Sequence, residues 1–276
     1  MAEGPRLHPW NESFTWAPGT ARSGRLTSTQ VEAFDRDGFV VLESAIGPDV
    51  LAPLVRDLDD LEGQADAFLQ GFDHGRVSIA ESGAIVFGIH PSTRYESAAA
   101  FVRLPLFADL CHDLVGPDSR LYWDQLVYKS PEKPRRFPWH QDNGYGFVEP
   151  QQYLTCWVAL TDATLDNGCP WIVPGQHRRG TLAHDYVEPL GFECMTDHPD
   201  ARPVPVPAGS VIVFSSLTPH LTGPNVTDAV RKAYIVQYAP DGAEVLRGEP
   251  GDGPPTHREP LDDARQVWIL RHGRPA

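Results

Sequence analysis

The sequence predicts a mainly β protein, a jelly roll with α-helices flanking its N-terminal side. After Gly116 the chain consists of short apolar or alternating runs separated by Pro, Gly, Asn and Asp, which is typical of all-β proteins. Eight such runs follow within about 120 residues, the number expected for a barrel or for two facing sheets. Before residue 115 the pattern is mostly helical, and a chain of 276 residues can form one large domain.

The first elements are an irregular arm, a helix and a strand. Residues 1–24 contain prolines and glycines and lack a sustained period. "LTSTQVEAFDRDG" then predicts a short helix, with Thr27 as N-cap, Gln30 completing a capping box and Gly38 as the stop. "FVVLES" follows as a strand.

Two more helical stretches and another strand are expected before the β-rich part. "GPDVLAPLVRDLDDLEGQ" (47–64) has leucines and valine spaced for one apolar stripe and a proline near its start. "AIVFGI" (84–89) predicts a strand, and "YESAAAFVRLPLFADLCHDLVG" (95–116) predicts a helical stretch.

The jelly-roll strands are expected at eight apolar runs. These are "RLYWDQLVYK" (120–129), "FPWHQD" (137–142), "YLTCWVALT" (153–161), "PWIVP" (170–174), "PVPV" (203–206), "SVIVFSS" (210–216), "HLTG" (220–223) and "KAYIVQYA" (232–239).

Composition excludes several classes of protein. The formal net charge is -14 and no basic run occurs, so nucleic acid is not an expected partner. No window approaches the roughly eighteen apolar residues of a membrane span, and the first residues lack a signal-peptide pattern. We therefore expect a cytoplasmic protein without membrane contact. The four cysteines have no paired spacing and are expected to be buried free thiols.

One short motif suggests a metal site. In "WHQD", His140 and Asp142 are two residues apart, so on a strand both side chains would point to the same face. His220 follows a buried strand and is the best third ligand. Two histidines and one carboxylate form the facial triad of non-haem Fe(II) oxygenases. The alternative is a packed polar pair in the core, because H-x-D is common by chance.

Arg231 is a candidate anion-binding residue beside the candidate metal ligands. It begins the strand that follows His220. A guanidinium at the start of an inward-facing strand needs an anionic partner, and a dicarboxylate co-substrate would supply one.

Together these motifs resemble one enzyme family. His140-x-Asp142, "DNGCPWIVPGQHRRG" (166–180), His220 and Arg231 occur in the order typical of the phytanoyl-CoA hydroxylase (PhyH) family of Fe(II)/2-oxoglutarate dioxygenases. "LTSTQVEAFDRDGFVVL" and "DQLVYKSP" are also similar to that family's opening helix and strand and to its first barrel strand. The resemblance spans roughly residues 26–240.

The resemblance implies a cupin-like double-stranded β-helix and a division of the chain. We expect an irregular arm over residues 1–24 and a single dioxygenase domain over 25–245. Within that domain, the helical part is 25–115 and the jelly-roll core is 116–245. Residues 246–276, rich in Pro, Gly and Asp, would be a mobile or peripheral C-terminal tail.

The resemblance also implies the site. His140, Asp142 and His220 would bind Fe(II), and Arg231 with Thr222 would hold the C5 carboxylate of 2-oxoglutarate. Two further residues could reach the co-substrate or could equally be packing residues. These are Gln125 and Trp157. Ascorbate is expected to support activity in vitro.

The implied reaction hydroxylates an unactivated C–H bond and releases succinate and carbon dioxide. Related halogenases have Gly or Ala in place of the carboxylate, so the presence of Asp142 favours oxygenation. Desaturation, epoxidation or cyclisation by the same iron chemistry stays open. Two other classes are a non-catalytic jelly-roll binding domain and a zinc hydrolase. The retained polar set and the lack of H-E-x-x-H weigh against them.

The substrate is expected to be a small molecule, such as a secondary metabolite, bound with dioxygen by a monomer or homodimer. The segment 68–100 and the loops 143–153 and 178–203 are candidates for a lid. Substrate contacts are expected from aromatic and polar residues of these regions and of the nearby strand. They are Phe72, Phe87, His90, Arg94, Tyr145, Phe147 and Trp171.

Overall fold

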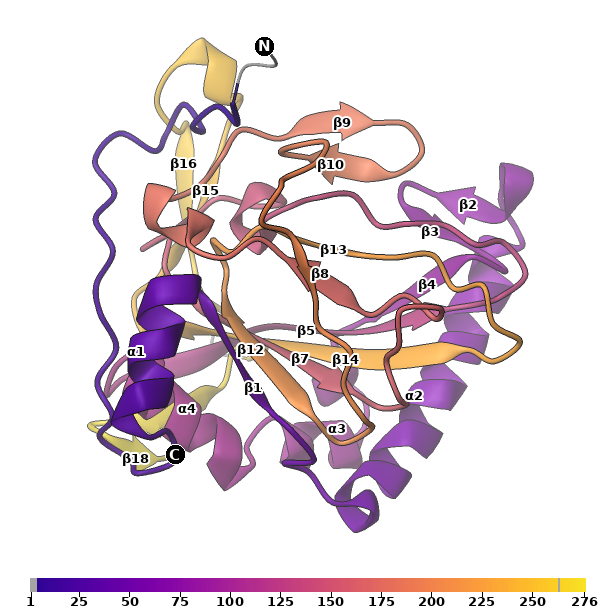
Figure 1. Cartoon of the computed structure of the whole chain (residues 1–276), viewed down its shortest axis with the longest axis horizontal. Coiled ribbons are helices and arrows are strands. Elements are labelled where there is room, and N and C mark those ends of the chain that lie inside the picture. Colours follow the sequence, from indigo (N-terminus) through magenta and orange to yellow (C-terminus); the bar gives the residue numbers. More distant parts are fainter. Residues whose placement is uncertain (1–3, 263) are drawn as a thin grey trace.

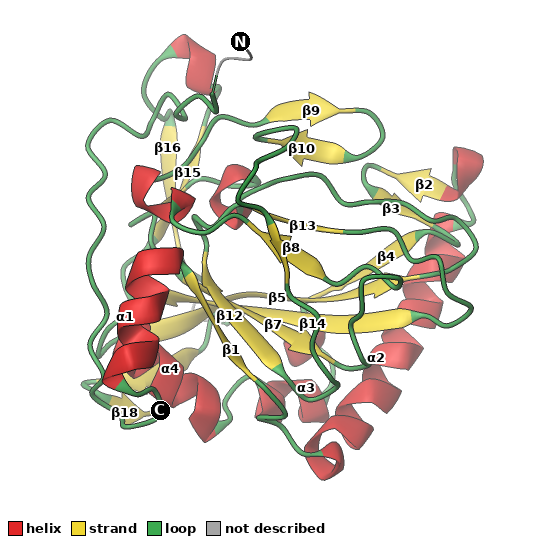
Figure 2. Cartoon of the chain, viewed as in Figure 1, coloured by secondary structure: helices red, strands yellow, loops and turns green. Residues whose placement is uncertain are grey.

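A ten-stranded antiparallel sheet forms the centre of the computed structural model, which describes residues 4–262 and 264–276. Helices cover one face of this sheet, and smaller sheets lie over the other (Figure 1, Figure 2). The fold is a jelly roll of the double-stranded β-helix type with N-terminal helices, as the sequence predicts.

The large sheet takes its strands from both halves of the chain. In order across it they are β1 (Phe39–Leu42), β12 (Val211–Ser215), β7 (Leu154–Ala159), β14 (Arg231–Pro240), β5 (Ser119–Lys129), β4 (Ile85–Ile89), β3 (Ala80–Glu81) and β2 (Arg76–Val77). β17 (Trp268–Arg271) also pairs with β5, and β18 (Arg274–Pro275) pairs with β17.

Three smaller sheets lie apart from the large one. One consists of β11 (Arg202–Pro203), β8 (Pro170–Ile172) and β13 (His220–Thr222), and another of β16 (His257–Pro260), β15 (Glu244–Arg247) and β6 (Val148–Glu149). β9 (Asp185–Val187) and β10 (Gly191–Glu193) form a separate hairpin.

The helices are α1 (Ser28–Asp37), α2 (Pro48–Leu69), α3 (Glu96–Phe101) and α4 (Pro105–Leu114). Thr27 and Gln30 form the predicted capping box of α1, and Gly38 ends the helix at a φ of 84°. The predicted helical stretch 95–116 consists of two helices, α3 and α4. Pro105 cannot continue the preceding helix because it lacks an N–H group, and it instead occupies the first turn of α4.

Most predicted jelly-roll strands are confirmed, and "FPWHQD" is the main exception. In that segment only His140 makes a β-bridge, and Asp142 begins a 3-10 helix, η3 (Asp142–Gly144). The "PVPV" segment forms little more than the short β11 and one bridge at Val206. Two prolines in four residues remove the N–H donors that a longer ladder would need.

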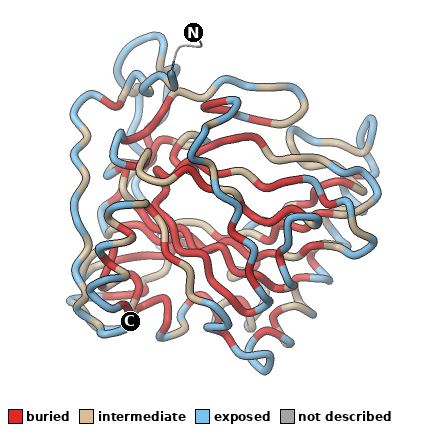
Figure 3. Tube along the Cα trace, in the orientation of Figure 1, coloured by how far each residue is buried: buried red, intermediate tan, exposed pale blue. Residues whose placement is uncertain are grey.

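Each face of the large sheet has its own core. On the helix-covered face, residues such as Tyr234 and Val236 of β14 pack with α1 to α4. On the opposite face, Ala233 and Ile235 pack with Ile172 of the small sheet. Successive residues of a strand point to opposite faces, so Arg231 lies on the face that meets the small sheet. Figure 3 shows the central strands as the most buried part of the chain.

The two ends of the chain are tied to the body of the protein. The N-terminal arm pairs with the jelly roll through a bridge between Leu7 and Leu182. The C-terminal tail was expected to be mobile or peripheral, but β17 extends the large sheet, and its Ile269 and Leu270 are buried. Tertiary pairing outweighs the turn-rich composition of this segment.

The four cysteines are buried and unpaired, as predicted. In the described part of the chain, no helix has the length and hydrophobicity needed to cross a membrane.

Candidate functional site

Two histidines from distant segments are placed side by side by their own backbones. The His140 N–H donates to the His220 carbonyl, and the His220 N–H donates to the His140 carbonyl, each at 2.9 Å. The two imidazole centroids are 4.1 Å apart. This reciprocal pair joins the segment before η3 to β13 and fixes both rings over the same face of the small sheet.

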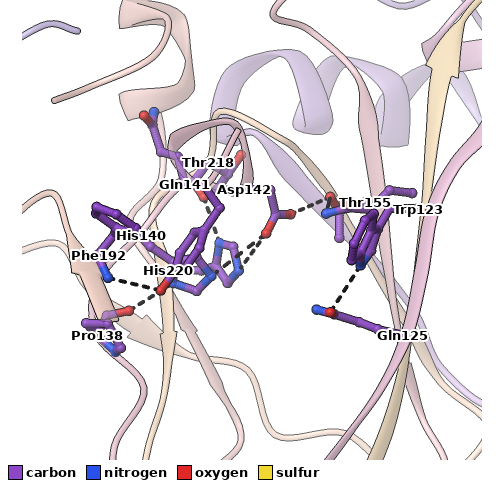
Figure 4. A network of polar contacts seen from close by, with 12 residues as sticks. Trp123, Gln125, Pro138, His140, Gln141, Asp142, Thr155, Phe192, Thr218 and His220 are labelled. Atoms are coloured by element: carbon purple, nitrogen blue, oxygen red, sulfur yellow. Dashed lines mark hydrogen bonds and ion pairs between the residues drawn. The ribbon is translucent and has the colours of Figure 1, made fainter. Parts of the chain in front are cut away.

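Asp142 completes the cluster from the start of η3. Its Oδ1 atom lies 3.8 Å from Nε2 of His140 and 3.8 Å from Nε2 of His220. One ligand atom from each residue lies within 4.8 Å of the others, and Figure 4 shows the three side chains converging. The predicted cluster therefore forms, although a bridge followed by a turn brings it together and not a regular strand.

Each imidazole is oriented by a backbone carbonyl. Nδ1 of His140 lies 2.9 Å from the Pro138 carbonyl, and Nδ1 of His220 lies 3.0 Å from the Thr218 carbonyl. A proton on Nδ1 satisfies these carbonyls and leaves the Nε2 lone pair free for a metal. Burial and the neighbouring His220 hold the pKa of His140 well below its usual value, so the ring is neutral. A neutral imidazole is the metal-binding form.

The Asp142 carboxylate has one oxygen held and one available. The Thr155 hydroxyl donates to Oδ2 at 2.5 Å, and the Gln237 amide donates to that hydroxyl at 3.3 Å. Thr155 lies on β7 and Gln237 on β14, so the large sheet supports a ligand that belongs to the loop. The sequence alone did not indicate either residue.

Gln141, between the two ligands, anchors the metal-binding segment. Its side-chain amide donates to the carbonyls of Gly180 and Leu217 and accepts the N–H of Leu182. Its own N–H donates to Nε2 of His184 at 2.9 Å. The buried glutamine has its donors and acceptor occupied, which restricts movement of His140 and Asp142.

Arg231 is a buried cation with no hydrogen-bond partner among the described residues. Its side chain is fully buried, and Nε, Nη1 and Nη2 are all unpaired. Burial lowers the pKa of Arg231 to about 10, so the group stays charged at neutral pH. A buried, unpaired guanidinium is costly unless an anion binds it. The donor set fits one end of a dicarboxylate.

Lys129 adds a second buried cation next to Arg231. The two residues are cross-strand partners on β5 and β14. The Lys129 ammonium donates to the carbonyls of Thr222 and Gly223 at the end of β13 and to that of Arg135. Burial and the Arg231 charge hold its pKa well below the usual value. Lys129 thus ties β5 to the strand that carries His220.

The other predicted co-substrate residues lie around the same space. Trp157 is buried on β7, with the Arg231 guanidinium 5.2 Å from its ring centre. Thr222 is on the same face of β13 as His220, two residues on. Gln125 lies on β5, where its Oε1 accepts from Trp123 Nε1 at 3.1 Å. Figure 4 shows Gln125 across from the histidine–aspartate cluster.

The predicted substrate residues divide by location. Tyr145 contacts His140, with ring centres 5.3 Å apart, and Phe87 is on the inner face of β4, in the second core cluster. Phe147 instead packs against His8 of the N-terminal arm. Trp171 packs in a cluster behind the small sheet, because it alternates with the inward-facing Ile172.

Three further predicted substrate residues have no described contact with the triad. Phe72 is exposed after α2 and packs against Phe68. Arg94 ends a short 3-10 helix after β4. His90 is buried against the edge of the Trp123 ring, at a ring-centre distance of 4.2 Å.

The donor set as a whole fits iron and a dicarboxylate. Two imidazole nitrogens and one carboxylate oxygen gathered within 4.8 Å of one another match the facial triad of non-haem Fe(II) oxygenases. The buried, unpaired guanidinium of Arg231 has the charge and the donors that a carboxylate group requires.

Comparisons with known proteins agree with this geometry. A family model described as Phytanoyl-CoA dioxygenase (PhyH) matches residues 34–233. The chain is 25% identical over 257 residues to phytanoyl-CoA dioxygenase domain-containing protein 1 of Bos taurus, covering 76% of this chain and 88% of that protein. It is 34% identical over 131 residues to methylphosphonate hydroxylase of Gimesia maris, covering 47% and 49%.

A solved structure shares the fold. The epimerase SnoN, in complex with Fe3+, alpha ketoglutarate and nogalamycin RO, superposes with a TM-score of 0.67 at 20% identity. The likeness covers 87% of this chain and 97% of that one.

Proposed function

This chain belongs to the phytanoyl-CoA dioxygenase (PhyH) family of 2-oxoglutarate-dependent non-haem iron dioxygenases, and on that premise we propose that it hydroxylates an unactivated C–H bond of a small molecule. The proposal includes a role in secondary metabolism. Methylphosphonate hydroxylase, a similar protein, is named for the same reaction type. The observation that carries the proposal is the buried, unpaired guanidinium of Arg231 together with the histidine–aspartate cluster.

In the proposed site, His140, Asp142 and His220 would hold Fe(II), and Arg231 would hold the distal carboxylate of 2-oxoglutarate. When bound, iron and 2-oxoglutarate supply the oxidising chemistry that transfers one oxygen atom of dioxygen to a C–H bond, leaving succinate and carbon dioxide. Thr222, Gln125 and Trp157 would complete the co-substrate pocket.

The protein's own contribution is orientation and exclusion of water. The Pro138 and Thr218 carbonyls fix the two imidazoles, and the Thr155 hydroxyl fixes the carboxylate. Phe214 packs against His220, with ring centres 4.5 Å apart, and Ile235 is buried on the same face of β14 as Arg231. A dry, preorganised site strengthens the interaction between Arg231 and an anion, because solvent does not screen the charges.

The sharpest test is a matched pair of substitutions on β14. We expect Arg231→Met to weaken anaerobic 2-oxoglutarate binding to the Fe(II) protein by about 100-fold, since truncating one partner of a buried charge pair typically costs 2–5 kcal/mol. Lys232→Met, which removes the neighbouring, partly exposed cation paired with Asp59, should leave binding unchanged. Binding is measured by titration under argon.

The thermal midpoint of the ligand-free protein gives an independent readout. Arg231→Met should unfold at the same temperature as the wild type or higher, because it removes an unpaired buried charge. Wild-type protein should also form succinate with Fe(II), ascorbate, oxygen and 2-oxoglutarate, whereas His140→Ala should not. Failure of the wild-type Fe(II) protein to bind 2-oxoglutarate would contradict the proposed roles.

A further inference from the structure

Aromatic rings from three parts of the chain form a continuous row beside the metal-binding cluster. We call this row the aromatic arc; it consists of Phe87, Phe137, Tyr145, Phe192 and Tyr186. Successive ring centres are 6.1, 6.0, 5.5 and 5.4 Å apart. The row starts on β4 and ends on the β9–β10 hairpin. Distances of this size are those of interacting aromatic pairs.

The arc touches one of the proposed iron ligands. The ring centre of His140 lies 4.6 Å from that of Phe137 and 5.3 Å from that of Tyr145, edge-on in both cases. A molecule held on the arc would therefore lie next to the metal centre.

The outer part of the arc is open to solvent. Relative exposure is 38% for Tyr145, 38% for Phe192 and 47% for Tyr186. Ile89, which shares the inner face of β4 with Phe87, is 46% exposed. Exposed apolar side chains beside a polar site are typical of a ligand-binding surface.

The hairpin that carries the outer rings is held in place before any ligand binds. The Phe192 N–H donates to the Tyr145 hydroxyl at 3.2 Å. Gly191 makes this approach possible, because a Cβ at that position would lie 2.7 Å from the Tyr145 hydroxyl oxygen, and its φ of 106° also favours glycine. The arc is thus a preformed surface.

The cations that flank the arc are already paired. Arg136 forms an ion pair with Glu193 of β10 at 2.7 Å. Arg76 of β2 forms an ion pair with Glu188, in the turn between β9 and β10. Arg135 pairs with Glu81 of β3 through Nη2, although its Nη1 is buried without a hydrogen-bond partner. Recognition of a phosphate or carboxylate normally uses an uncommitted Arg or Lys. These ion pairs hold the β2–β3 and β9–β10 hairpins in place. The side chains of the arc itself carry no charge.

We propose that the aromatic arc is the substrate site and that it takes an uncharged small molecule with a hydrophobic ring system. The ring would stack on Phe137 and Tyr145 and present a C–H bond to the site at His140. Phe192 and Tyr186 would cover its outer face. This inference rests on the proposed dioxygenase function and narrows its substrate class.

The test uses two probes with the same ring and different charge, 2-naphthol and 2-naphthoate. Each is titrated anaerobically into the Fe(II) protein with 2-oxoglutarate. We expect 2-naphthol to bind at least about tenfold more tightly than 2-naphthoate. Phe192→Ala should weaken 2-naphthol binding by about tenfold, the loss expected for one stacked aromatic contact.

A control on α2 separates the arc from exposed aromatic surface in general. Phe68 is 64% exposed and packs on Phe72, outside the arc, so Phe68→Ala should bind 2-naphthol as the wild type does. Equal binding by Phe192→Ala and wild type, tighter binding of 2-naphthoate, or no binding of 2-naphthol would each overturn the inference. In those cases 2-oxoglutarate would still bind, whereas failure of the proposed function would abolish that binding too.

Discussion

Gly144, which ends η3 after Asp142, lies against the ring of His184. A Cβ at this position would lie 2.0 to 2.3 Å from atoms of the His184 ring. That ring accepts the Gln141 N–H, and burial lowers the pKa of His184 to about 4, so it is a neutral acceptor at pH 7. A single missing methyl group therefore allows the imidazole to hold the backbone between His140 and Asp142.

A pair of glycine substitutions tests this contact. Gly144→Ala should lower the free energy of unfolding by about 1–3 kcal/mol, the usual cost of overpacking, and should weaken Fe(II) affinity. Gly146→Ala should have little effect, because its Cβ would meet only the Tyr122 hydroxyl, at 3.9 Å. Urea unfolding and anaerobic Fe(II) titration give the two readouts. Similar values for both variants would argue against the contact.

Some residues of the candidate site could be recognised from the sequence alone, and others could not. The sequence indicated His140, Asp142, His220 and Arg231, because their types and spacing are those that a metal ion and a carboxylate require. Supporting residues such as Thr155 and Gln237, and the arc members Phe137, Phe192 and Tyr186, could not be recognised in this way. Their roles arise from contacts between segments distant in sequence, and each residue type is equally common in an ordinary core.

At the scale of elements, α4 organises the N-terminal arm through one carboxylate. Asp113 is buried and accepts the backbone N–H groups of Arg22, Ser23 and Leu26 and the Ser23 hydroxyl. The four donors belong to the segment just before α1, and all of them bond to the carboxylate of Asp113. The arm is irregular in dihedral angles and still fixed in position, because its polar groups find partners outside regular secondary structure.

Removing that carboxylate should release the arm. Asp113→Ala should lower the free energy of unfolding by about 2–4 kcal/mol, because buried donors lose their acceptor. Trypsin should cut faster after Arg22 and Arg25. Asp109→Ala, on the same helix, removes only an exposed ion pair with Arg25 and should change stability by less than about 1 kcal/mol. Equal trypsin sensitivity of the two variants would contradict the role of Asp113.

The order of the elements was largely predictable, and their boundaries were less so. Capping residues and apolar periodicity indicated α1, α2 and most jelly-roll strands. The strand expected at "FPWHQD" is only a bridge at His140, since Pro138 removes one N–H and η3 begins at Asp142. In the tail, β17 was missed because it is stabilised by pairing with β5, which local propensity does not report.

For the molecule as a whole, buried neutral histidines make stability depend on pH. Burial lowers the pKa of His177 to about 4. Its ring packs edge-on against Trp16 at 4.4 Å, and its Nε2 lies 3.2 Å from the Asp35 carbonyl. The unfolded chain takes up a proton near pH 6.5, while the folded protein does not. Keeping His177 neutral therefore costs no free energy of unfolding above pH 6.5. The free energy of unfolding falls as the pH drops from 6.5 toward 4.

The expected slope can be measured. Each such histidine costs about 1.4 kcal/mol of unfolding free energy per pH unit within that window. His177→Gln should reduce the loss of stability between pH 6.5 and 5 by about 2 kcal/mol relative to the wild type. Urea unfolding at a series of pH values provides the comparison, with His257→Gln as an exposed control. Identical slopes for wild type and His177→Gln would contradict this assignment.

The reciprocal backbone pair between His140 and His220 also bears on the order of folding. It closes a loop of about eighty residues, which includes β7, β8 and β12. Closing a loop of that length costs entropy that only the completed jelly roll offsets. We therefore expect the third predicted ligand to join the other two late in folding. Iron would be captured by an already folded chain, so metal supply should govern how much protein is active, with little influence on how much folds.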